Sequence, residues 1–150
     1  MSSSSRFDPS QDAAKAYQAL YGVTNILGEG SLPHSLKHLV DLRVSQLNGC
    51  SYCIGLHTDW GKRDGETAER LGAVAEWRHS PLFTAAERAA FEWAEALTER
   101  RADAIDGLHA RLGEHFDRAG VAELTMMVAV TNAWNRVGIA FHREPAHAAA

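Results

Sequence analysis

The sequence predicts an all-α fold, a single-domain helical bundle of six to seven helices. Apolar side chains recur three and four residues apart in several segments, which is the period of one helix face. No segment shows sustained strict alternation of apolar and polar residues, so no strand is expected. At 150 residues the chain is long enough for one domain with a sizeable core.

The domain is expected to span residues 8–143. Residues 1–7 contain a serine run and are predicted to be a disordered N-terminal tail. Residues 144–150 are small and are predicted to be a flexible C-terminal tail.

The first two helices are predicted from their start and stop signals. Asp8 followed by Pro9 is typical of an N-cap and a first helical residue, and the helix they open should stop near Gly28. Ser31 is predicted to cap a second helix over residues 33–48, whose apolar positions have helical spacing.

The next two helices follow a chain break at Asn48-Gly49. The third helix is expected to run from Cys50 to about Lys62. A shorter fourth helix is expected over residues 66–77.

The C-terminal half is predicted to hold three more helices. Thr84 and Glu87 have the spacing of a capping box, which opens a helix to about residue 100. Residues 105–118 should form another helix. The last predicted helix follows Gly120 and is apolar around much of its circumference, which indicates burial in the bundle or in a subunit interface.

Composition excludes several classes of partner. The net charge of −4 gives no general support for binding to nucleic acid or to an anionic membrane. No apolar run approaches the roughly 18 residues that span a bilayer. The N-terminus lacks the apolar region of a secretory signal, so we expect a cytoplasmic protein in a reducing compartment.

The chemistry of the chain is predicted to centre on its only two cysteines, Cys50 and Cys53, and on His57. At about 100° per helical residue, the three side chains fall within roughly 60° on one helix face. In a reducing compartment, a C-x-x-C pair indicates redox chemistry or metal binding more often than a structural cross-link. We expect a redox-active Cys50–Cys53 pair, with no metal and no other cofactor.

Two local effects distinguish the cysteines. The helix N-terminus favours a thiolate at Cys50 and, less strongly, at Cys53. His57 lies about 6 Å along the helix axis from Cys53 but about 10.5 Å from Cys50, which is beyond direct reach. Because a nearby base assists deprotonation directly, we assign Cys53 as the attacking thiolate and Cys50 as the resolving thiol. Cys53 would form a sulfenic acid and condense with Cys50, and a partner dithiol would reduce the disulfide.

Two blocks of the sequence carry a family resemblance. The run Leu32–Cys53, followed by His57, resembles the AhpD-like alkylhydroperoxidase group of the carboxymuconolactone decarboxylase superfamily, and so does the run Thr131–Arg136. The resemblance covers most of the chain from about Leu32 to Phe141. It implies an AhpD-like fold, assembly as trimers or hexamers, and peroxidase activity with a peroxide as substrate. It also implies a reducing dithiol protein as partner.

The resemblance carries over to individual residues. Cys50, Cys53 and His57 match the family's positions, with the second cysteine as the peroxidatic one. In the family, a glutamate twelve residues before the first cysteine joins a histidine and water in a proton relay, and that position is His38 here. An imidazole does not orient a neighbouring histidine as a carboxylate would. Asp41, one turn further along the same helix, is the candidate substitute.

Two other functions remain open from the sequence. One is a lyase acting on a lactone acid, by analogy with the superfamily's decarboxylases, although such chemistry has no need of a dithiol. The other is a non-catalytic redox or metal-binding adaptor, because His34, His38, Cys50 and Cys53 offer a Cys₂His₂ set that suits tetrahedral zinc.

Overall fold

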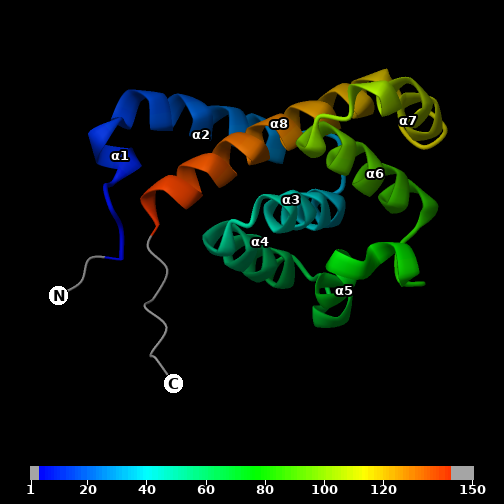
Figure 1. The fold of residues 1–150 in the computed structure, drawn as a ribbon, viewed down its shortest axis with the longest axis horizontal. Helices are drawn as coiled ribbons and strands as arrows, with labels where there is room; N and C mark the ends of the chain where they lie inside the picture. Colours follow the sequence, from blue (N-terminus) through cyan, green and yellow to red (C-terminus); the bar gives the residue numbers. More distant parts are fainter. Residues whose placement is uncertain (1–3, 143–150) are drawn as a thin grey trace.

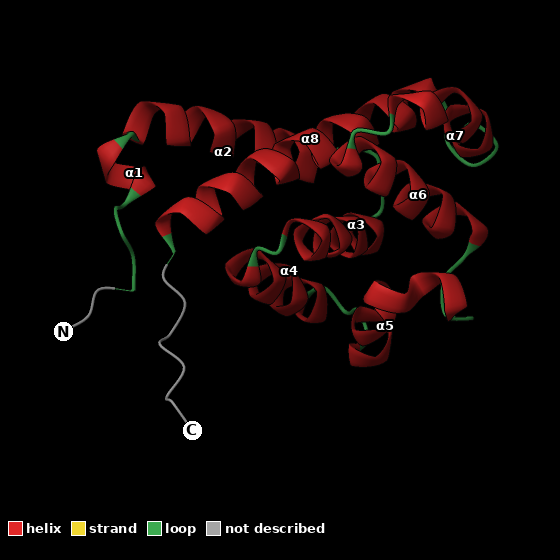
Figure 2. Ribbon diagram, viewed as in Figure 1, coloured by secondary structure: helices red, strands yellow, loops and turns green. Residues whose placement is uncertain are grey.

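The computed structural model describes residues 4–142, and these residues form an all-α, single-domain fold, as predicted (Figure 1). They contain no β-strand, apart from an isolated bridge between Ser5 and His142 (Figure 2). The eight α-helices and two 3-10 helices of this part of the chain are α1 (Pro9–Asp12), α2 (Ala14–Gly28), α3 (His34–Asn48), α4 (Ser51–Arg63), α5 (Ala68–Ala73), η1 (Val74–His79), α6 (Ala85–Glu99), η2 (Ala102–Ala104), α7 (Ile105–Leu112) and α8 (Arg118–Phe141).

The long helix α8 is the axis on which the other helices are arranged. In Figure 1 it runs the length of the molecule, with α2 along one side and α3 and α4 on the other. It contacts α2, α3, α4 and α6, and α3 in turn contacts α4 and α6. The core therefore lies where α3, α6 and α8 meet, and its fully buried side chains include Leu39, Val44, Phe91, Leu112 and Leu124.

A buried ion-pair network holds α3 and η1 to α6. The carboxylate of Glu95 is 3% exposed and accepts hydrogen bonds from Arg43 (2.8 Å), Trp77 (2.8 Å) and Arg78 (2.6 Å). Burial alone would raise the pKa of Glu95, but these three donors lower it, so the carboxylate is held in its charged form. The network compensates each buried charge with a partner.

One predicted helix is divided in two, which is why eight helices form where six to seven were predicted. Asp8 caps the first turn as expected, and its carboxylate accepts the N–H of Ser10. Ala13 then leaves the helical region, with φ −135° and ψ 45°, and separates α1 from α2. No glycine or proline marks this break in the sequence.

The prediction that Ser31 caps the second helix is wrong. The N-cap of α3 is Pro33, which has no side-chain cap. The N–H and hydroxyl of Ser31 instead donate to the Glu123 carboxylate on α8, at 3.0 and 2.8 Å, because a charged acceptor forms the stronger hydrogen bond. The predicted end of this helix is confirmed, since Asn48 is its last residue and Gly49 adopts the left-handed conformation at φ 67°.

The later helices follow the predicted order with shifted ends. The capping box of Thr84 and Glu87 is confirmed at the start of α6. The helix predicted over 105–118 ends at Leu112. The last residues of that predicted range belong to the start of α8, whose N-cap is Asp117, and the Asp117 carboxylate accepts the N–H of Gly120. Gly120 therefore lies in the first turn of α8 rather than before it.

Some of the predicted tail packs against the end of α8. The N–H of Arg6 donates to the Phe141 carbonyl at 2.7 Å, and its guanidinium donates to the His142 carbonyl at 2.5 Å. Phe7 packs edge-on against the Phe141 ring. The remaining tail residues, 1–3 and 144–150, lie outside the described part of the chain. Within residues 4–142, no helix has the length and apolar character to cross a bilayer.

Candidate active site

The two cysteines lie at the N-terminus of α4. Gly49 turns the chain out of α3, and Cys50 is the N-cap of α4, which therefore begins at Ser51. The Cys50 sulfur accepts the backbone N–H of Cys53 at 3.2 Å, as a serine or aspartate oxygen does at other helix N-termini. A thiolate here would be stabilised by the N–H groups of the first turn and by the helix dipole.

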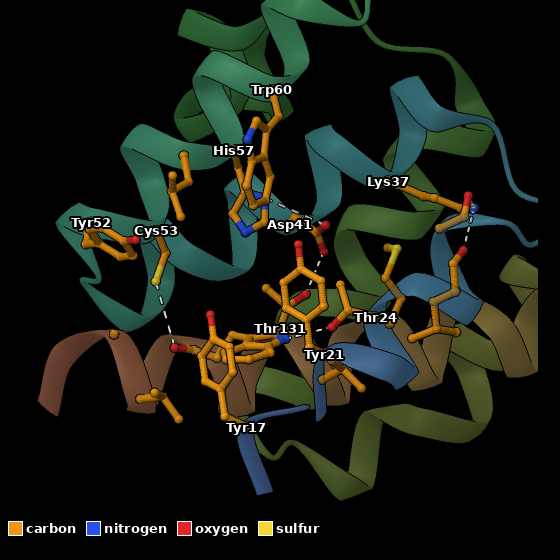
Figure 3. Close-up of a pocket in the computed structure, with 18 of the residues that line it drawn as sticks. Tyr17, Tyr21, Thr24, Lys37, Asp41, Tyr52, Cys53, His57, Trp60 and Thr131 are labelled. Carbon is orange, nitrogen blue, oxygen red and sulfur yellow. Dashed lines mark hydrogen bonds and ion pairs between the residues drawn. The ribbon is translucent and has the colours of Figure 1, made fainter. Parts of the chain in front are cut away.

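Cys50 and Cys53 are joined as a disulfide, with their Cα atoms 5.2 Å apart. Both are buried, Cys50 at 1% exposure and Cys53 at 5%. Cys53 lines the large pocket described below, and Cys50 lies behind it at the helix end. The Cys53 sulfur faces α8 and lies 4.0 Å from the Trp134 carbonyl oxygen (Figure 3).

Gly138 of α8 leaves the space that the disulfide occupies. A Cβ atom at this position would lie 2.8 Å from the Cys53 sulfur and 2.9 Å from the Cys50 sulfur. Both distances are shorter than any ordinary non-bonded contact. Gly138 thus permits the close approach of α8 to α4, and the sequence contains no local signal that would have identified it.

A pocket of about 400 Å³ opens beside Cys53. Its walls come from α1, α2, α3, α4 and α8, and Figure 3 shows side chains of α2, α3, α4 and α8 that line it. The lining is largely apolar and rich in aromatic rings, among them Tyr17, Tyr21, Tyr52, Trp60 and Trp134. The Trp134 indole is fixed by its N–H, which donates to the Thr24 hydroxyl at 2.7 Å.

Asp41 and His57 are neighbours in the wall of this pocket. The His57 Nδ1 atom lies 3.8 Å from the Asp41 carboxylate, which also accepts the Thr131 hydroxyl at 2.6 Å. Within the described residues, His57 Nδ1 is a buried polar atom without a hydrogen-bond partner. In Figure 3 the imidazole points into the pocket and towards Asp41. A small rotation or one water would complete the pair.

Burial shifts the pKa of both groups towards their neutral forms. Desolvation lowers the pKa of His57, against the opposing effect of Asp41. Desolvation likewise raises the pKa of Asp41, although His57 and the Thr131 hydrogen bond favour its charge. His57 is therefore a neutral imidazole near neutral pH, which is the form that can accept a proton.

His38 lines the pocket, but its ring is bound to a group on α4. Its Nε2 atom lies 2.6 Å from the carboxylate of Asp64, the C-cap of α4. The structure thus places Cys53, His57, Asp41 and His38 around one pocket. Thr131 and Trp134 also line this pocket, and the sequence marked them only as part of the run that resembles the family, without a role.

The chain is similar to several known proteins. The model of the carboxymuconolactone decarboxylase family matches residues 11–96. The Bacillus subtilis protein YdfG, which is uncharacterized, is 33% identical over 113 residues, covering 75% of this chain and 77% of YdfG. The uncharacterized Escherichia coli protein YnjA is 35% identical over 97 residues, or 65% of this chain, which spans 53% of the length of YnjA.

A solved structure resembles the whole fold. It is that of ATU0492 from Agrobacterium tumefaciens, a protein of unknown function with a suggested role in AhpD-type antioxidant defence. The TM-score is 0.88 at 28% sequence identity, and the match covers 94% of this chain and 99% of ATU0492.

Proposed function

The chain is an AhpD-like member of the carboxymuconolactone decarboxylase family, and from this premise we propose that it is a thiol-dependent hydroperoxide reductase. The substrate in this proposal is an organic hydroperoxide, and the reductant is a dithiol protein. The observation that carries the proposal is the Cys50–Cys53 pair, with Cys53 beside a pocket that also holds His57 and Asp41.

The location of the two sulfurs supports different roles for them. Cys53 lines the pocket, so a hydroperoxide bound there meets its sulfur first. Cys50 is 1% exposed and lies within bonding distance of Cys53, which suits a thiol that reacts only with its neighbour. The open, apolar pocket of about 400 Å³ is large enough for a bulky organic group rather than hydrogen peroxide alone.

The reaction takes place in three steps. The Cys53 thiolate attacks the terminal peroxide oxygen, the O–O bond breaks and Cys53 becomes a sulfenic acid, while the departing alkoxide takes the proton that His57 accepted from the Cys53 thiol and leaves as an alcohol. The Cys50 thiol then attacks the Cys53 sulfenic acid, the S–O bond breaks, and water and the disulfide form. A partner dithiol reduces this disulfide by exchange and is itself oxidised to a disulfide.

His57 and Asp41 are the proposed proton-transfer pair. The neutral imidazole accepts the proton of the Cys53 thiol, and the adjacent carboxylate stabilises the imidazolium that results. Asp41 takes the place of the family's glutamate in this scheme, because the ring of His38 is held by Asp64 instead. His38 is left with an indirect effect on the charges of Asp41 and His57.

Self-association belongs to the same proposal. Large apolar side chains are exposed on α2 and α8, among them Ile26 (72%), Met126 (52%) and Ile139 (48%). Burial of such side chains between copies would favour a homo-oligomer, with a trimer or hexamer as the expected size. Sedimentation equilibrium that gave a monomer at high concentration would contradict this part of the proposal.

The test is a stopped-flow reaction of fully reduced protein with cumene hydroperoxide. Two thiols per chain should be lost and one alcohol formed. Cys53→Ser should abolish the reaction. Cys50→Ser, the matched control, should still react once and leave a sulfenic acid at Cys53 that a dimedone probe captures. Unchanged thiol counts after excess hydroperoxide would show that the proposal is wrong.

A further inference from the structure

Three side chains of kinds that can bind metal ions, His34, His38 and Asp64, lie close together. His34 is the first residue of α3, His38 follows one turn later, and Asp64 is the C-cap of α4. Each offers one ligand atom, and the three atoms lie within 4.8 Å of one another. Because α4 packs against α3, its end returns to the start of α3 and brings Asp64 to the two histidines.

The donor set is that of a transition metal. Two imidazoles four residues apart lie on the same helix face, and a carboxylate completes three ligands. Imidazole nitrogen and carboxylate oxygen together favour zinc and neighbouring divalent metals over calcium or magnesium.

We infer that His34, His38 and Asp64 form a binding site for a divalent transition-metal cation, with Zn²⁺ as its best match. Bond lengths of about 2.0–2.2 Å in a tetrahedral site place neighbouring ligand atoms about 3.4 Å apart. The His38 and Asp64 atoms, now 2.6 Å apart, would separate by less than 1 Å to admit the ion. Asp64 has room to do so, since its side chain is 42% exposed.

The site differs from the metal set considered from the sequence. That set combined His34 and His38 with the two cysteines, but both sulfurs are bonded to each other in the disulfide. Asp64 takes their place as the third ligand, with water at the remaining position. The inference does not depend on peroxidase activity, because none of its three ligands bonds to the peroxide or transfers a proton in the proposed reaction.

A simple ion pair is the competing explanation for this cluster. His38 and Asp64 already form one at 2.6 Å, and such a pair requires no metal and no third residue. A metal site requires His34 as well, although His34 is exposed and is neither the donor nor the acceptor of that pair. His34 is therefore the residue that separates the two explanations.

The experiment is calorimetric titration of ZnCl₂ into the untagged, oxidised full-length chain near neutral pH. We expect one ion per chain. His34→Gln and Asp64→Asn should each weaken binding at least tenfold. His115→Gln, which removes an exposed histidine between α7 and α8, should leave the affinity unchanged. The Cys50→Ser/Cys53→Ser double variant should also bind with unchanged affinity, since no sulfur is a ligand.

Two further measurements make the result decisive. Far-UV circular dichroism checks that each variant keeps its helix content, which is expected because the side chains of His34 and Asp64 lie at the surface. Visible absorption of the Co²⁺ form reports the ligand set directly, and its bands should change in His34→Gln. Absence of saturable binding, or equal affinity in His34→Gln and the native chain, would overturn the inference.

Discussion

Gly138→Ala should destabilise the oxidised protein more than the reduced one. The added methyl group would lie 2.8 and 2.9 Å from the two sulfurs of the disulfide. Since non-bonded atoms meet at about 3.5–4.0 Å, the sulfurs or α8 must move by about 0.6 Å or more. Overpacking of this kind costs about 1–3 kcal/mol.

Helix propensity partly offsets that cost. Replacing an interior helical glycine with alanine stabilises a helix by up to about 1 kcal/mol. Gly22→Ala in α2 provides the matched control, because nothing lies within 4 Å of its added Cβ. The two variants should therefore differ by about 1–3 kcal/mol in the oxidised state, with the control more stable than the native chain.

The redox state supplies the second arm of this test. In the reduced protein each thiol can rotate about its Cα–Cβ bond and relieve the contact with the residue at position 138. A difference of about 1.4 kcal/mol between the two states would shift the thiol–disulfide equilibrium tenfold towards the dithiol, or about 30 mV. Guanidinium unfolding of both variants, with and without reductant, measures each value. If Gly138→Ala behaves like Gly22→Ala in both redox states, the proposed packing is wrong.

Three other changes test the charges around the pocket and in the core. The pKa of His57 is lowered in the fold from its ordinary 6.5, so its contribution to stability is complete above about pH 6.5 and is lost as pH falls through the folded value. Urea unfolding should thus show a smaller loss of stability from pH 7.5 to 5 in His57→Asn than in the native chain, because the variant lacks the imidazole that gains a proton more readily in the unfolded chain. The pKa of Asp41 is raised in the fold, so its contribution to stability has the opposite pH dependence, and both chains contain it. Thr131→Val should lower stability by about 1.5–3 kcal/mol at pH 8, since it removes a hydrogen bond to buried Asp41, and a loss below 0.5 kcal/mol would contradict this. Glu95→Gln should cost about 3 kcal/mol by thermal or urea unfolding, whereas the half-exposed pair of Glu92 makes Glu92→Gln a control that costs less than about 1 kcal/mol.

The features that the sequence predicted correctly depend on neighbouring residues. The capping box at Thr84 requires only residues within one turn, and the end of α3 requires only a glycine after Asn48. The same holds for Cys50 at the start of α4. Such local signals located both cysteines and His57 on one helix.

The features that it missed depend on contacts between distant segments. Serine is a common helix N-cap, but the N–H and hydroxyl of Ser31 donate to the Glu123 carboxylate on another helix. His38 and Asp64 are 26 residues apart, and only the packing of α4 on α3 brings them together. Gly138 is one of twelve glycines, and its importance arises from the position of the disulfide on a different helix.

The pocket is lined by two separate parts of the chain. The two cysteines lie inside the segment 11–96 that matches the family, whereas α8, which supplies Met127, Val130 and Phe141 to the lining, lies beyond it. On α8, the space beside the two sulfurs restricts position 138 to glycine, whereas Met127, Val130 and Phe141 present larger side chains to the pocket. Substitutions at those three positions would therefore change the shape of the pocket and leave the space beside the disulfide as it is.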